Sequence, residues 1–181
     1  MKQEAPIRIL DMGCGDGGNY IINQGENVSY VLVDRRLCPS LAMKYPDALC
    51  VVANIQYLPF PDGAFDKLET RFPHQTLLWP GLESVTGVGK LSQQKREPTW
   101  YPEFARVLKE SGTLTIWSDV PWINVEQVFN DSASYFEVVN IDERVSNGEL
   151  EKMGSFGCEM VLQKGTTVKK IILKKKKNCT L

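Results

Sequence analysis

The 181-residue chain has the composition of a single globular domain, with 43% hydrophobic and 24% charged residues and a net charge of −1. No run of about 18 apolar residues is present, which excludes a membrane-spanning helix, and the opening MKQEAPIRIL lacks the apolar core of a signal peptide. Five widely spaced cysteines without a C-x-x-C pair favour free thiols in a reducing, cytoplasmic compartment over a disulfide framework or a metal site.

The charge is divided unevenly along the chain. Residues 169–181 contain six lysines and no acid, so residues 1–168 carry 15 Lys and Arg against 22 Asp and Glu, a net charge of −7. We therefore expect a single acidic domain over residues 1–174, followed by a basic tail at 175–181. Such a tail can contact phosphates or remain a solvated end, and we favour the second interpretation.

Strand and helix patterns alternate along the first 135 residues. The expected strands are Ile7–Met12, Ser29–Val33, Ala48–Ala53, Phe65–Phe72 and Thr113–Ser118. The expected helices are Gly18–Gln24, Pro39–Tyr45, Trp100–Lys109 and Val125–Tyr135. This alternation is typical of a parallel sheet with helices on both faces.

Beyond residue 135, strand patterns follow one another directly. They are Phe136–Ile141, Glu159–Gln163 and Val168–Lys174, and the last two close around Lys164-Gly165. The sequence therefore predicts an α/β fold: a seven-stranded, mostly parallel Rossmann-like sheet with helices on both faces and an antiparallel C-terminal hairpin.

A strand that runs into a glycine-rich turn, IRILDMGCGDGG at residues 7–18, is the main candidate for a ligand site. Glycine has no Cβ, so its backbone can adopt positive φ and lie against a ligand, while a following helix N-terminus favours an anionic group. The spacing G-x-G-x-x-G at 13–18 fits the dinucleotide fingerprint. The overlapping D-x-G-x-G-x-G at 11–17 resembles the first motif of class I S-adenosylmethionine-dependent methyltransferases.

Two later blocks favour the methyltransferase resemblance over the dinucleotide one. NIQYLPFPDGAFD at residues 54–66 resembles the family's stretch after its third strand, although Asn54 stands where Asp is usual. Tyr101–Gly112, followed by TLTIW, resembles the family's helix and fifth strand. The ordered blocks span Ile7–Trp117, and the sequence shows no constellation for hydride transfer.

The resemblance implies that S-adenosylmethionine is the cofactor and that the glycine turn binds its methionine part. Gly13, Gly15 and Gly17 would let the backbone approach the ligand. Asp11 would brace the loop or meet the amino group, and the resemblance also places Cys14 among the cofactor-binding residues.

The nucleoside part of the cofactor is assigned by the same resemblance to residues after the second and third strands. Asp34 would accept hydrogen bonds from the ribose hydroxyls, with a helix cap as the alternative role, and Arg35 lies beside it. Asn54 and the backbone of Ile55 would contact the adenine, while Leu37 and Leu58 are candidates to pack on the ring.

The methyl acceptor is not identified by the sequence. Arg71-Phe72-Pro73-His74 stands where methyltransferases of amide or base amino nitrogens often have Asn/Asp-Pro-Pro-Tyr/Phe. His74, the only histidine, is a candidate catalytic base, with an exposed loop histidine as the alternative. The long, aperiodic segment Pro73–Pro98 is expected to form the acceptor side of the site.

Two alternatives stay open at this point. Phe72-Pro73, Trp79-Pro80 and later basic residues are similar to tRNA methyltransferases that form 7-methylguanosine, which would make this an RNA guanine methyltransferase. Because few residues precede the first strand, the family's usual cap over the acceptor is expected to be missing, which suggests a non-catalytic, cofactor-binding protein that acts with a partner. The expected partners are an acceptor (small molecule, protein or RNA) and a protein partner or second copy, but no membrane.

Overall fold

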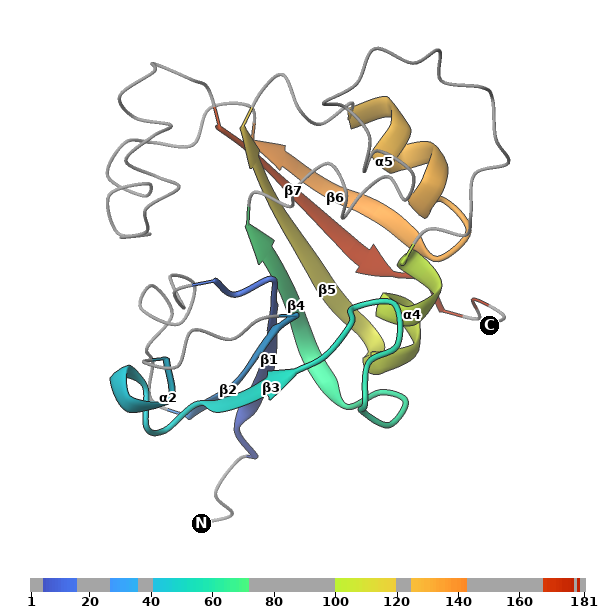
Figure 1. Ribbon diagram of the computed structural model, residues 1–181. Coiled ribbons are helices and arrows are strands. Elements are labelled where there is room, and N and C mark those ends of the chain that lie inside the picture. Colours follow the sequence, from blue (N-terminus) through green and yellow to red (C-terminus); the bar gives the residue numbers. More distant parts are fainter. Residues whose placement is uncertain are drawn as a thin grey trace, which may run out of the picture.

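A computed structural model gives the arrangement of the chain (Figure 1). It describes residues 5–15, 27–35, 41–71, 100–119, 125–142, 168–177 and 179. The strands are β1 (Ile7–Met12), β2 (Val28–Asp34), β3 (Leu49–Val52), β4 (Phe65–Arg71), β5 (Leu108–Asp119), β6 (Phe136–Asp142) and β7 (Val168–Lys175). The helices in the described ranges are α2 (Leu41–Lys44), α4 (Tyr101–Val107) and α5 (Val125–Ser132).

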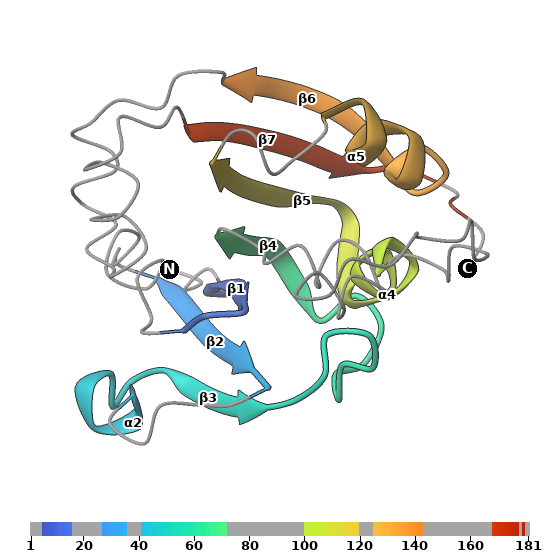
Figure 2. The ribbon, with the colours of Figure 1, turned by 45° about the horizontal axis from the view of Figure 1, so that its top comes forward.

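The strands form a single sheet in the order β3-β2-β1-β4-β5-β7-β6, which Figure 2 shows as a twisted fan from β3 at one edge to β6 at the other. Strands β1 to β5 pair in parallel, whereas β7 lies antiparallel between β5 and β6. The predicted fold class is thereby confirmed. Because the chain leaves β1 toward β2 on one side and reaches β4 on the other, the β1–β4 boundary is the topological switch point, where open α/β sheets bind ligands.

Alternating side chains along the central strands explain why both faces of the sheet carry helices. Leu10 of β1 belongs to a large core that includes side chains from α4 and α5. Its neighbour Ile9 belongs to a smaller core on the opposite face, which includes Leu41 of α2. Successive strand residues point to opposite faces, so the apolar runs in β1 and β2 cover both cores at once.

The junction between α4 and β5 differs from the sequence prediction. We expected a helix to Lys109 and a strand from Thr113, but the helix ends at Val107 and Leu108 is already extended, with φ −83° and ψ 135°. Leu108 pairs with Phe65 at the start of β4, and the register then shifts before Thr113. The strand pairing of a fully buried Leu108 outweighs the helical propensity of the segment that contains it.

The C-terminal strand reaches one residue into the segment that the sequence assigns to the basic tail. Lys175 belongs to β7, and its Nζ donates a hydrogen bond to the carbonyl of Leu108 at 2.8 Å. The Nζ of Lys176 donates to the carbonyl of Ala133. The predicted elements Gly18–Gln24 and Glu159–Gln163 lie outside the described residues. Within the described ranges, no helix is long and apolar enough to span a membrane.

Candidate functional site

Three short segments meet at the carboxyl ends of β1, β2 and β3. They are Gly13–Gly15 after β1, Asp34 at the end of β2, and Ala53–Asn54 after β3. Parallel pairing brings them to one edge of the sheet, because Met12 is in register with Val33, and Asp34 with Val52. This edge is the one at which doubly wound sheets bind their ligands.

The turn after β1 depends on glycine at two positions. Gly13 has φ +67° and Gly15 has φ +52°. Both values lie in the left-handed region, which residues with a Cβ adopt only at a cost in free energy. The N–H groups of Gly13 and Cys14 both donate to the carbonyl of Val33, at 2.8 and 3.1 Å, which anchors the turn on β2. A Cβ at Gly15 would have no atom of the described residues within 4 Å, so none of them packs against this part of the turn.

Asp34 joins the two other segments of the site. Its carboxylate Oδ2 accepts a hydrogen bond from the N–H of Gly15 at 3.2 Å. Its backbone carbonyl accepts one from the N–H of Ala53 at 3.1 Å. Arg35 follows it and is exposed. Asp34 thus connects the glycine turn to the segment after β3.

Asn54 begins a tight turn at the third segment. Its side-chain Oδ1 accepts from the N–H of Gln56 at 3.1 Å, and its carbonyl accepts from the N–H of Tyr57 at 2.9 Å. Asn54 is exposed, whereas Ile55 is buried beneath the turn with 6% of its surface accessible. An amide oxygen has two lone pairs, so Oδ1 can accept a second hydrogen bond from a ligand.

Asp11 and Cys14 lie below the rim of the site. Each is 1% exposed, and Asp11 occupies a position inside β1 in register with Glu69 of β4. Burial and the nearby carboxylates of Asp11 and Asp34 raise the pKa of the Cys14 thiol far above its usual range, which keeps it protonated and unreactive. The burial of Asp11 supports a bracing role beneath the turn.

The described residues bring together most of the predicted cofactor site. They include Asp11, Gly13, Cys14, Gly15, Asp34, Arg35, Asn54 and Ile55. Gly17, the candidate base His74 and the segment Pro73–Pro98 lie outside the described residues, so the acceptor side of the site remains a sequence prediction.

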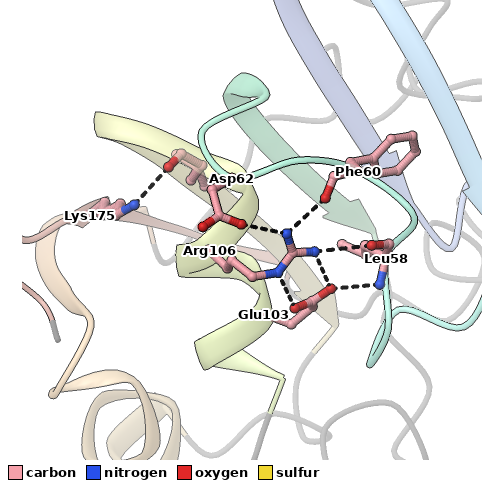
Figure 3. A network of polar contacts seen from close by, with 7 residues as sticks. Leu58, Phe60, Asp62, Glu103, Arg106 and Lys175 are labelled. Carbon is pink, nitrogen blue, oxygen red and sulfur yellow. Dashed lines mark hydrogen bonds and ion pairs between the residues drawn. The ribbon is translucent and has the colours of Figure 1, made fainter. Parts of the chain in front are cut away.

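A polar network next to the site was not anticipated from the sequence. Figure 3 shows Arg106 and Glu103 of α4 contacting the backbone of the segment that follows Asn54. The signal available in the sequence was the E-x-x-R spacing within a helix, which brings the two side chains to the same face. That spacing does not reveal which loop the pair would hold.

Comparison with solved structures identifies the fold. No protein-family model and no curated protein matches the sequence. An antibiotic-related methyltransferase matches with a TM-score of 0.71 and 17% identity, over 95% of this chain and 89% of that one. The cyclase SpnF matches with a TM-score of 0.62 and 15% identity, over 95% and 76% of the two chains. Phosphoethanolamine N-methyltransferase 2 of Haemonchus contortus, solved with S-adenosyl-L-methionine, matches with a TM-score of 0.63 and 13% identity, over 97% and 50%.

These similarities establish the fold of class I S-adenosylmethionine-dependent methyltransferases. They do not by themselves establish the reaction, since a cyclase has the same fold. The function therefore has to be inferred from the residues of the site.

Proposed function

We propose that this protein binds S-adenosylmethionine and transfers its methyl group to an acceptor that is still unidentified. The observation that carries the proposal is the position of Asp34, which hydrogen-bonds both the glycine turn and the segment before Asn54. An acid at the end of β2 between these two segments is suited to accept from ribose hydroxyls.

The residues present fit such a cofactor in three respects. No atom of the described residues lies within 4 Å of a Cβ placed at Gly15, so these residues leave room for an elongated ligand beside the backbone. The carboxylate of Asp34 lies beside that turn. The exposed amide of Asn54 retains an acceptor lone pair for the adenine amino group.

The cofactor supplies a methyl group already activated by the sulfonium charge, which is transferred by in-line displacement. The chain therefore has mainly to bind and orient the two reactants and to exclude water. Gly13 and Gly15 would hold the methionine part and Asp34 the ribose, while Asn54 and the Ile55 backbone would orient the base. His74 is the candidate base for the acceptor, on the sequence evidence alone.

A labelled-cofactor assay tests the proposed reaction. The full chain would be incubated with methyl-labelled S-adenosylmethionine and, separately, with RNA, protein and small-molecule pools. Transfer into a single pool identifies the acceptor class, and transfer into RNA that is recovered as methylated guanosine after digestion selects the RNA guanine alternative. Cofactor binding without transfer by the isolated chain would instead support a non-catalytic protein that acts with a partner.

The free thiols of the described residues are consistent with a protein that works in a reducing compartment. Cys14, Cys50 and Cys179 are unpaired cysteines in the described part of the chain. Together with the wide cysteine spacing of the sequence, they support our proposal that the protein works in the reducing environment of the cytoplasm.

A further inference from the structure

Arg106 on α4 donates all five of its guanidinium N–H groups, two to Glu103 on the same helix and three to the loop at residues 58–62 (Figure 3). Its Nε and Nη2 donate to the two carboxylate oxygens of Glu103, both at 2.7 Å. Nη2 also donates to the carbonyl of Leu58 at 3.0 Å. Nη1 donates to the carbonyl of Phe60 and to Oδ1 of Asp62, both at 2.8 Å.

The peptide groups on both sides of Leu58 are held by this pair. The N–H of Leu58 donates to Oε1 of Glu103 at 2.6 Å, while its carbonyl accepts from Arg106. The Leu58 side chain is also buried, with 4% of its surface accessible. The position and orientation of Leu58 are therefore fixed from α4.

Leu58 comes directly after the Asn54–Tyr57 turn, which is closed by a hydrogen bond from the Tyr57 N–H to the Asn54 carbonyl. At its other end, the turn follows Ala53, whose N–H donates to the carbonyl of Asp34. The turn is thus held by β2 on one side and by α4 on the other. A shift at either support would move the Asn54 side chain relative to Asp34.

The two charges of the pair reinforce one another. The hydrogen bond from Arg106 outweighs partial burial and holds the pKa of Glu103 below its usual range, with the Leu58 N–H contributing. The hydrogen bonds to Glu103 and Asp62 likewise raise the pKa of Arg106. Lysine offers one compact point charge, so it cannot reproduce this planar fork of contacts.

We propose that Arg106 and Glu103 are positioning residues for base recognition: by fixing Leu58 they hold Asn54 where it reads the adenine edge. Neither side chain would contact the ligand. The inference rests on the proposed function, because it assumes that the Asn54–Tyr57 turn receives the adenine of S-adenosylmethionine.

The test compares two ligands that differ only in the base edge. Isothermal titration measures the affinity of the full chain for S-adenosylhomocysteine and for its inosine counterpart, in which a carbonyl replaces the exocyclic amine. The variants are Arg106→Lys and Glu103→Gln, with Asp62→Asn as the matched control. Asp62 is 76% exposed and contacts the same guanidinium, but it does not hold Leu58.

The wild type should prefer the adenine ligand. Arg106→Lys should weaken its binding about tenfold and should affect the inosine ligand much less, so that the preference for adenine falls. Glu103→Gln should have the same effect to a smaller extent, because its amide oxygen can still accept from Leu58. Asp62→Asn should leave both affinities within about twofold, as expected for an exposed ion pair.

A purely structural role would lower the melting temperature of Arg106→Lys and leave the ratio of the two affinities unchanged, which would overturn the proposal. Failure of both network variants to fold would also count against it, since the pair would then be a determinant of folding. If the folded wild type binds neither ligand, the proposed function fails as well. If the wild type binds the adenine ligand, and the variants keep the same ratio of adenine to inosine affinity, only the positioning role is rejected.

Discussion

The carboxylate of Asp34 lies 3.2 Å from the backbone N–H of Gly15, so an acid at the end of β2 is tied to the glycine turn after β1. This contact makes the candidate site a connected unit, since the Asp34 carbonyl also holds Ala53 at 3.1 Å. The two strands alone would bring these segments to the same edge of the sheet. The hydrogen bonds fix their relative orientation, which is what a ligand spanning both segments requires.

Replacing Asp34 should weaken cofactor binding. Asp34→Ala removes the proposed acceptor of the ribose hydroxyls, and we expect a loss of about 1.5–3 kcal/mol, the scale of hydrogen bonds to a charged group. Isothermal titration with S-adenosylhomocysteine measures this loss. Unchanged affinity in a folded Asp34→Ala protein would remove Asp34 from the site.

Asp66 provides a matched control at the opposite, amino ends of the parallel strands. It lies at the start of β4, where its carboxylate accepts from the Arg8 N–H at 2.9 Å and from Lys109 Nζ at 2.7 Å. Asp66→Asn should lower stability modestly and leave cofactor affinity unchanged, because the site lies at the carboxyl ends of the strands. If Asp34→Ala and Asp66→Asn weakened cofactor binding equally, the loss at Asp34 would reflect a global perturbation of the fold and not the loss of a ligand contact.

Two substitutions at Gly15 separate backbone strain from contact with the ligand. At φ +52°, Gly15→Ala should destabilise the fold by about 1–2 kcal/mol, whereas Gly15→Asn should cost less because Asn tolerates this conformation better. If the ligand lies against this backbone, Gly15→Asn should nevertheless weaken binding at least as much as Gly15→Ala. Affinities that simply follow stability would argue against a ligand at this turn. Chemical denaturation and titration of the same samples provide both quantities.

Gly112→Ala should destabilise the protein without affecting the site. A Cβ there would collide with the buried Leu108 side chain and lie 3.0 Å from the carbonyl oxygens of Asp66 and Lys109. We expect a loss of about 1–3 kcal/mol in the free energy of unfolding, as for other overpacked positions. Urea denaturation measures it. A fully stable Gly112→Ala protein would contradict the described packing of the α4–β5 junction.

The network on α4 should make stability depend on acid pH. The pKa of Glu103 is lowered in the folded protein, so its contribution is complete above the unfolded value of about 4.3 and is lost as the pH falls through the folded value. At pH 7, Glu103→Gln should cost about 1.5–3 kcal/mol in unfolding free energy. The difference from wild type should shrink below about pH 4. A difference independent of pH would show that ionisation of Glu103 contributes nothing.

The parts of the fold that repeat a simple pattern could be predicted from the sequence. Burial on both faces of β1, typified by Ile9 and Leu10, follows directly from a continuous apolar run, and the strand Ile7–Met12 was predicted with its observed bounds. Antiparallel pairing at the C-terminal end of the chain was also predicted. The place of β7 between β5 and β6 was not, because strand order depends on pairings between residues far apart in the chain.

Features that depend on tertiary contacts could not be predicted. Leu108 looks like the last turn of a helix, and only its pairing with Phe65 makes it the first residue of β5. Arg106 looks like a surface residue of an amphipathic helix, yet its guanidinium is occupied by backbone carbonyls almost fifty residues earlier, at Leu58 and Phe60. The glycine turn was recognisable because its pattern is local, whereas the support of the Asn54 turn comes from a distant helix.

A crystal structure of the full chain with S-adenosylhomocysteine tests the central claim most directly. We expect electron density with the ribose hydroxyls on the Asp34 carboxylate, the amino acid part along Gly13–Gly15 and the adenine edge at Asn54. Density for the ligand at a different place would contradict it, as would an empty site in crystals grown at saturating ligand.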